Sequence, residues 1–477
     1  MNISSIKAGL IFILVPLAIL LGLRLFGFDG MAGQDSYAYV DYAIEIKKWL
    51  IMGIPPGHFA WPPGYSLLGV CFSLGLFSIA LTMQLISCLS LSLILITLRV
   101  LLRNLYPSAD QVSLVVYLVV FGMFAPYFFR QGMVTTSDMV AGLMVTLSIY
   151  FGYKFTLKNE FKDLIYTAVA VSFGTFTRYP TILVLTPWIL YLVFLWYTTV
   201  RKIWHLIILC IPLCFIYVYS LFNTDIALFL HHPSVIHWEW SNYWKTTFIS
   251  EEGTVHHLLP NMLFAFSPLA HPGYMLPGVL FIYLFFKENR AKGYQWIYWT
   301  LGYLSFVFFL AGYMNQNYRH LIIIYPIVLL ACFCGFEKMF QRLLEYYTWK
   351  YILTGCMIVQ CILCFRAIYP TLKRNSLERN IAHEILQYRD TINPVLYAFD
   401  IDIALKSRGI PYTIMSLYNR SYSTFQPGAM VLFNEPKLKT QWSGMNPMNN
   451  WNRLKSQYRL IKIKDFPDQW TLFKISQ

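Results

Sequence analysis

The chain has 477 residues, of which 57% are hydrophobic and only 13% are charged, and its mean hydropathy is +0.51. A soluble domain carries about 25% charged residues, so this composition excludes a soluble globular protein. The net charge of +14 does not indicate nucleic-acid binding, because much of it lies in short loops beside apolar stretches. This pattern is typical of the cytoplasmic loops of a polytopic membrane protein.

The first apolar stretch predicts a membrane-spanning helix from roughly Ala8 to Phe26, too long for a cleavable signal peptide. A polar break follows from Asp29 to Leu68, and within it Asp35 precedes a helical pattern from Ser36 to about Ile51. We expect this helix to lie in the membrane interface. One face of the helix is predicted to carry Asp41, Glu45 and Lys48. Another is predicted to carry Tyr37, Ile44 and Ile51.

The remaining apolar stretches complete a count of about eleven transmembrane helices. We expect the later spans near residues 78–100, 112–129, 139–155 and 164–177, and then ending near 201, 222, 287, 313, 336 and 367. With the N-terminus inside, basic clusters at 99–103, 154–162, 201–202, 287–292 and 338–350 all fall on the cytoplasmic side. The consistency of this alternation supports the count.

Polar composition from about Lys373 onward predicts a small C-terminal α/β domain on the extracytoplasmic side. The segments expected to form strands are PVLYAFD, YTIMSL, AMVLFNE, YRLIKIKD and WTLFKI, with ALKSRG as a helix between them. We therefore divide the chain into a transmembrane domain, residues 1–370, and an α/β domain, residues 371–477. The first holds an outer loop at about 28–64 and a second large outer loop at about 223–261.

Charged and polar side chains gather at the predicted outer ends of the helices. They are Asp35, Arg130, Asp138, Arg178, Tyr179, Arg319 and His320. Such residues are costly near a bilayer and therefore mark candidate sites. Arginines beside one or two carboxylates suit an anionic, membrane-borne substrate, because the guanidinium group binds phosphate through two parallel hydrogen bonds.

This set of side chains fits glycosyl transfer from a polyprenyl-phosphate sugar. The acceptor hydroxyl loses a proton as it attacks, so a carboxylate can act as general base and contribute about 10²–10⁴-fold. The leaving phosphate is already a stable anion and needs electrostatic stabilisation rather than a proton. One base and several arginines are therefore sufficient.

The segments GQDSYAY (33–39) and WPPGYSLL (61–68) together resemble the first outer loop of C-type glycosyltransferases. The similarity is to the bacterial branch related to protein O-mannosyltransferases and aminoarabinose transferases, and it covers about residues 1–340. In that family an Asp placed like Asp35 is the catalytic base, and Asp138 matches a second acid before the fourth span. Two weaker motifs are matched by Thr177-Arg178-Tyr179 and Tyr318-Arg319-His320. Ser36 departs from the family, which often has a second acid beside the base.

The chemistry and the resemblance together lead us to expect an inverting hexosyl- or pentosyltransferase of the bacterial inner membrane, active on the extracytoplasmic side. Its donor is a polyprenyl-phosphate-linked sugar, its acceptor a glycan, lipid or protein of the cell envelope. Asp35 is the expected base, Arg178, Arg319 and His320 hold the phosphate, and Asp138 positions a substrate. Further substrate contacts are expected from Tyr37, His58, Trp61, Tyr65 and Tyr179. No cofactor is firmly indicated, and a divalent cation stays open.

Structural roles are the alternatives for these residues. Asp35 can cap its helix, Arg178 and Arg319 can reach toward the lipid headgroups, and Trp61 and Tyr65 can belong to an interfacial aromatic belt. For the whole chain, the alternatives are a transporter or lipid-linked sugar flippase, a non-catalytic scaffold, or a transferase with a diphosphate-linked donor.

Overall fold

The computed structural model describes residues 3–57, 59, 61–73, 77–200, 202–222, 237–250, 253–287, 293–346, 348–388 and 394–476. The chain forms two compact units. The first comprises Met1–Gly30, Tyr42–Trp244 and Asn261–Tyr369, and the second comprises Met31–Asp41, Lys245–Pro260 and Pro370–Gln477. The units are described separately below.

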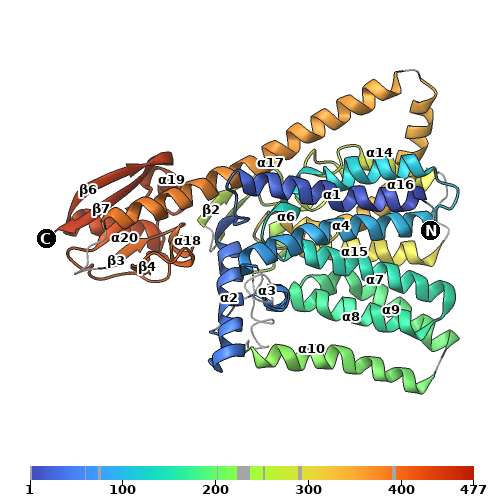
Figure 1. Ribbon diagram of the computed structural model, residues 1–477, viewed down its shortest axis with the longest axis horizontal. Coiled ribbons are helices and arrows are strands. Elements are labelled where there is room, and N and C mark those ends of the chain that lie inside the picture. Colours follow the sequence, from blue (N-terminus) through green and yellow to red (C-terminus); the bar gives the residue numbers. More distant parts are fainter. Residues whose placement is uncertain are drawn as a thin grey trace. The chain divides into compact units, whose positions relative to one another are not determined.

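The first unit is a helical bundle (Figure 1). Its helices are α1 (Ile3–Leu25), most of α2 (Gly33–Met52), α3 (Gly64–Ser73), α4 (Ile79–Leu105), α5 (Gln111–Tyr117), α6 (Pro126–Met133), α7 (Asp138–Lys158), α8 (Phe161–Thr177), α9 (Thr181–Thr199), α10 (Cys210–Leu221), α13 (Asn261–Ala265), α14 (Gly278–Lys287), α15 (Tyr294–Ala311), α16 (Tyr325–Leu344) and the start of α17 (Trp349–Ile385). Short helical turns are η1 (Leu118–Met123), η2 (Ile203–Leu209), η3 (Trp240–Tyr243), η4 (Ser267–Leu269) and η5 (Tyr318–Ile322).

Apolar helices dominate this bundle, in agreement with the predicted multi-pass membrane protein. Within the described residues, five helical stretches are long and apolar enough to cross a bilayer by themselves: α4, α7, α9, η2 with α10, and α17. A sixth arises if the bent pair formed by α5–η1 and α6 is one span. The predicted count of eleven therefore stays a prediction.

Close helix packing surrounds α7 and α9. Helix α7 lies between α4 and α8 (Figure 1), and α9 packs against α15. A Cβ atom at Gly302 of α15 would clash with the carbonyl group of Val184 on α9. Small residues of this kind allow two helix backbones to approach closely, as is common in membranes.

Two predicted spans have different ends in the structure. The expected span 112–129 breaks after η1, and α6 begins at Pro126 with a bend of 69°. Pro126 explains the break, because proline lacks the N–H that would continue the preceding helix. The span expected to end near Ala367 continues as α17 to Ile385, through Pro370.

The helix predicted from Ser36 to about Ile51 is present as α2, which begins at Gly33 and ends at Met52. Its buried side chains include Tyr37, Tyr39, Val40, Tyr42, Ala43 and Ile46, whereas Ile44 and Ile51 are exposed. Its expected place in the membrane interface stays a prediction.

The second unit contains the α/β domain expected from the sequence. Its sheet has the order β4-β3-β5-β7-β6, with β3 (Val395–Ala398), β4 (Thr413–Ser416), β5 (Met430–Phe433), β6 (Arg459–Phe466) and β7 (Trp470–Ser476). Strand β3 is parallel to β4 and β5, whereas β7 is antiparallel to β5 and β6. The predicted helix is α18 (Asp402–Ser407), and η6 (Leu386–Tyr388), α19 (Glu435–Gln441), α20 (Asn446–Gln457) and η7 (Pro467–Gln469) complete the domain.

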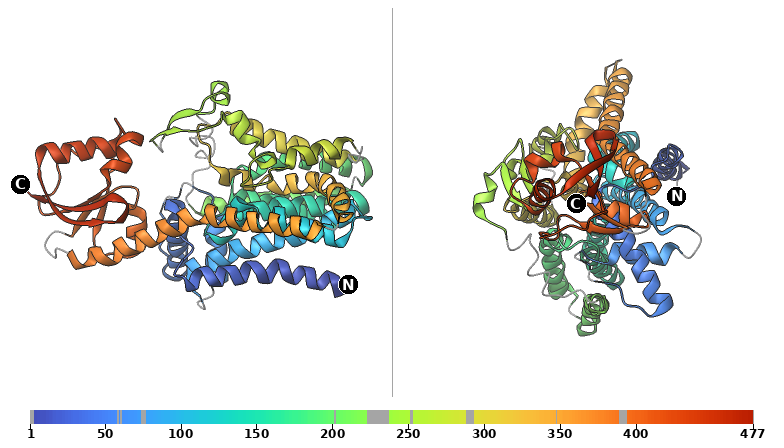
Figure 2. Two further views of the ribbon diagram at one scale, coloured as in Figure 1. Left: turned by 90° about the horizontal axis from the view of Figure 1, so that it is seen from above. Right: turned by 90° about the vertical axis from the view of Figure 1, so that its left-hand side faces the viewer.

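Helix α20 lies along one face of this sheet (Figure 2), where Trp451 stacks on Phe433 with ring centroids 4.5 Å apart. The same unit includes a hairpin from the second outer loop, formed by β1 (Thr247–Ser250) and β2 (Gly253–His256).

Candidate functional site

A buried ion pair joins two of the predicted site residues in the first unit. Asp138 is the first residue of α7, and Arg178 follows the last residue of α8. Arg178 Nη1 lies 2.7 Å from Asp138 Oδ1, and the two side chains are 12% and 0% exposed. A carboxylate is favoured in the first turn of a helix, but its complete burial requires the arginine beside it.

His320 of η5 completes this cluster. Arg178 Nη2 donates to His320 Nδ1 at 2.7 Å, while Nη1 also donates to Ser137 Oγ at 3.4 Å. Because a guanidinium group only donates, the His320 ring is neutral and carries its proton on Nε2. Burial lowers the pKa of His320 well below its usual value, and Arg178 and Arg319 lower it further. The cluster therefore carries one negative and one positive charge, with a neutral imidazole.

Arg178 is thus engaged by protein groups on both of its Nη atoms. We expected it to hold a phosphate, whereas the structure gives it Asp138 and His320 as partners. Asp138 Oδ1 forms the ion pair with Arg178, but neither Oδ1 nor Oδ2 has a hydrogen-bond partner among the described residues.

Arg130 on α6 adds positive charge near the cluster. It lies within electrostatic range of both Asp138 and Arg319, and its Cζ is 5.5 Å from the centroid of the Tyr127 ring. The sequence marked Arg130 only as an outer-loop charge, because its distance from α7 and η5 depends on the bend before α6. Arg130 and Arg319 are therefore the cations that stand beside the neutralised Asp138–Arg178 pair.

An aromatic group borders these cations. The ring of Tyr127 stacks on Tyr318 with centroids 4.5 Å apart and on His271 at 5.4 Å. Tyr274 is fully buried beside them, and its hydroxyl donates to the backbone carbonyl of Tyr318. None of these was predicted. The available signal was that Tyr127 and Tyr318 stand close to arginines in the segments PYFFR and YRH.

Asp35 and Tyr37 lie on α2 in the second unit. Asp35 is half-buried in the first turn of the helix. Tyr37 is 1% exposed, and its hydroxyl both donates to Glu378 and accepts from Arg408. This burial argues against the expected contact of Tyr37 with substrate. Because Asp35 belongs to a different unit from Arg178 and Arg319, its convergence with them stays a prediction.

The other aromatic and histidine residues that were expected to contact substrate have different environments. Tyr65 is 0% exposed and donates to the Met83 carbonyl at 2.8 Å, which argues for a structural role. Trp61 is partly exposed and packs beside Phe59, with centroids 5.4 Å apart. His58 lies outside the described residues.

Tyr179 lines an apolar cavity of about 380 Å³ between α8, α9 and α10. Its hydroxyl is 2.6 Å from that of Tyr219, and the walls are mainly apolar, with Phe176, Phe215 and Ile216 among the lining residues. Since Tyr179 directly follows Arg178, the cavity is one residue along the chain from the ion-pair cluster.

No group of three or more His, Cys, Asp or Glu side chains in the described ranges is arranged to hold a metal ion. The structure thus adds no support for the cation that the sequence left open.

Comparison with known proteins supports the fold. A family model for dolichyl-phosphate-mannose-protein mannosyltransferases matches residues 65–222. Two structures of ArnT from Cupriavidus metallidurans are similar at 13% sequence identity. The structure bound to undecaprenyl phosphate has a TM-score of 0.61, covering 97% of this chain and 98% of that one, and the apo structure has 0.57, covering 96% and 97%. No curated protein matches. The C-type glycosyltransferase fold expected from the sequence is therefore confirmed.

Proposed function

We propose that this protein is an integral membrane glycosyltransferase that moves a sugar from a polyprenyl-phosphate donor to an acceptor hydroxyl with inversion. The observation that carries the proposal is the Asp138–Arg178–His320 cluster with Arg130 and Arg319 beside it. It is supported by a fold shared with ArnT, whose structure is described as bound to undecaprenyl phosphate. We assign the reaction to the extracytoplasmic side of the bacterial inner membrane.

The proposed binding of the donor follows from the charges. Arg178 is neutralised by Asp138, so the phosphate is held chiefly by Arg319 and Arg130. Guanidinium groups stabilise the negative charge that returns to the phosphate as the glycosidic bond breaks. Asp138, Arg178 and His320 keep this end of the site rigid, which preserves the alignment of the reacting atoms.

Asp35 is the proposed general base, and chain connectivity supports this assignment. The Gly30 carbonyl accepts a hydrogen bond of 2.9 Å from Thr135 N, three residues before Asp138. Five residues further along the chain is Asp35, and an extended chain of that length spans at most about 18 Å. This limit on chain length is consistent with Asp35 serving a site that includes Asp138.

The apolar cavity beside Tyr179 is the proposed position for isoprene units of the donor. Its walls from α8, α9 and α10 are almost entirely hydrocarbon, and its lining residue Tyr179 directly follows Arg178 in the sequence. A polyprenyl chain is apolar along its length, so its burial there is favourable at about 25 cal/mol per Å².

The test is to incubate the purified protein in nanodiscs with a panel of polyprenyl-phosphate sugars and candidate acceptors from the cell envelope. We expect release of polyprenyl phosphate together with a glycosylated acceptor for one donor. Donor movement across vesicle membranes without any sugar transfer would refute the proposal and favour a flippase. Turnover only with a diphosphate-linked donor would refute the proposed donor class.

A further inference from the structure

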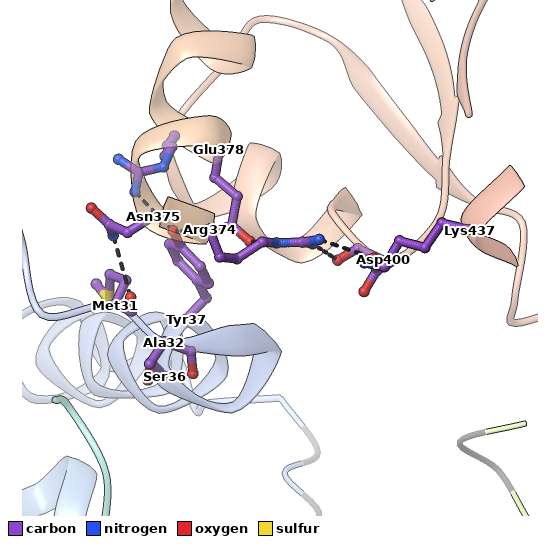
Figure 3. A network of polar contacts seen from close by, with 10 residues as sticks. Met31, Ala32, Ser36, Tyr37, Arg374, Asn375, Glu378, Asp400 and Lys437 are labelled. Carbon is purple, nitrogen blue, oxygen red and sulfur yellow. Dashed lines mark hydrogen bonds and ion pairs between the residues drawn. The ribbon is translucent and has the colours of Figure 1, made fainter. Parts of the chain in front are cut away.

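The segment that carries Asp35 is part of the same compact unit as the C-terminal domain. Residues Met31–Asp41 group with Pro370–Gln477, although more than three hundred residues separate them along the chain. Figure 3 shows this segment against the last part of α17, which leads into the domain. An interaction between such distant segments needs specific contacts, since neither composition nor chain connectivity requires it.

Tyr37 makes the central contact. Its hydroxyl donates to Glu378 Oε2 at 2.7 Å and accepts from Arg408 Nη2 at 2.8 Å. The Arg408 guanidinium carbon also lies 5.4 Å from the centroid of the Tyr37 ring. Both hydrogen-bond roles of the phenol are therefore used, and both partners are charged, which makes these bonds stronger than neutral ones.

The contact continues into the sheet domain through Arg374 (Figure 3). Arg374 Nε donates to Glu378 Oε1 at 2.5 Å, and Arg374 Nη1 lies 3.0 Å from Asp400 Oδ2. Lys437 Nζ binds the same carboxylate oxygen at 2.6 Å. The carboxylate that holds Tyr37 is thus fixed by a chain of ion pairs that ends on α19.

Two further contacts secure the same segment. Ser407 Oγ donates to Asp41 Oδ1 at 2.7 Å, and Asn375 Nδ2 donates to the Met31 carbonyl at 3.3 Å. Tyr37 and Asp41 lie one turn apart on one helix face. Asp35 precedes Tyr37 by two residues, which places it about 200° around the helix axis. The anchored face therefore leaves Asp35 directed away from the C-terminal domain.

We propose that the C-terminal domain positions the catalytic segment, with Tyr37, Glu378 and Arg408 as positioning residues that act through Asp35. This inference rests on the proposed function, in which Asp35 is the base. A displacement of about 1 Å at a reacting group can cost 10²-fold in rate. Loosening the Tyr37 anchor therefore lowers the rate of the chemical step more than it lowers donor affinity.

The test compares Tyr37→Phe with Tyr42→Phe in the full-length protein in nanodiscs. Tyr42 is a matched control, because it lies buried on the same helix and its hydroxyl has no hydrogen-bond partner among the described residues. We expect Tyr37→Phe to lower kcat by about 10–100-fold, with KM for the donor changed by less than about 3-fold. Hydrogen exchange at residues 31–41 rises in Tyr37→Phe and is unchanged in Tyr42→Phe.

A double variant makes the inference specific. If Tyr37 acts through Glu378, then adding Tyr37→Phe to Glu378→Ala lowers kcat little further, whereas Glu378→Gln, which retains an acceptor, recovers part of the rate. Equal kcat in Tyr37→Phe and the wild type, or a raised KM with unchanged kcat, overturns the inference. An active Asp35→Asn variant would instead remove the proposed function, so the two failures are distinguishable.

Discussion

Replacement of Arg178 by Met isolates the energetic role of the buried ion pair. The substitution leaves Asp138, whose side chain is 0% exposed, without its partner at 2.7 Å. Two unit charges 4 Å apart attract by about 4 kcal/mol at an effective dielectric constant of 20. Removing one member of a buried pair costs about 3–5 kcal/mol, because the other charge stays desolvated. We expect Arg178→Met to lower the free energy of unfolding by that amount.

The assay is equilibrium unfolding in mixed micelles, combined with the turnover rate of the folded fraction. The double variant Arg178→Met/Asp138→Leu is expected to recover most of the stability, since an apolar pair of similar volume leaves no buried charge. Lys154→Met is the control, because Lys154 pairs with buried Asp163 at 3.4 Å between the same two helices, α7 and α8. It should lower stability but leave the folded protein active.

A change below about 1 kcal/mol in Arg178→Met would refute this reasoning, because it would mean that water or lipid headgroups already solvate Asp138. The reasoning would also fail if the double variant were no more stable than the single one.

Two further predictions concern the cavity and the C-terminal domain. Ile216→Trp, which fills the cavity, should raise KM for long-chain donors but not for donors with a short prenyl chain; an equal effect on both would contradict chain binding there. Burial raises the pKa of Asp400, but the opposing effects of Arg374 and Lys437 are together larger and leave it below its usual value. Asp400 therefore stabilises the domain above its unfolded pKa of about 3.9 and loses this effect as pH falls through its lower folded pKa. We expect hydrogen-exchange protection of the C-terminal domain to depend less on pH in the acid range in Asp400→Asn than in the wild type. An unchanged pH dependence would contradict this.

Elements with a strong local pattern were predictable. The five strands of the C-terminal domain coincide with the expected segments, although β6 and β7 each end one residue beyond theirs, because short apolar runs bounded by turn residues are a local signal. The bend before α6 is not predicted by hydropathy, although the sequence contains Pro126, because the residues on both sides of the bend are apolar enough to suggest one span. The continuation of α17 past Pro370 is not predictable from composition, because the sequence becomes polar from Lys373 although the helix continues to Ile385.

The candidate site was only partly predictable. Its outer-side charges identified Asp138, Arg178 and His320, which the structure brings together. Their pairing could not be derived, because hydropathy does not say whether Arg178 contacts a substrate or a carboxylate. Tyr37 shows the same limit more strongly, since its partner Glu378 is 341 residues away and no local pattern links them.

The central claim is that Asp35 removes the proton from the acceptor hydroxyl. The most direct measurement is single-turnover sugar transfer by Asp35→Asn, with Glu45→Gln as a control acid on the same helix that accepts a hydrogen bond from Gly57 N at 2.9 Å. The account predicts that Asp35→Asn binds the donor normally but transfers sugar at least about 10²-fold more slowly, whereas Glu45→Gln keeps its rate. Transfer by Asp35→Asn at the wild-type rate would contradict the account.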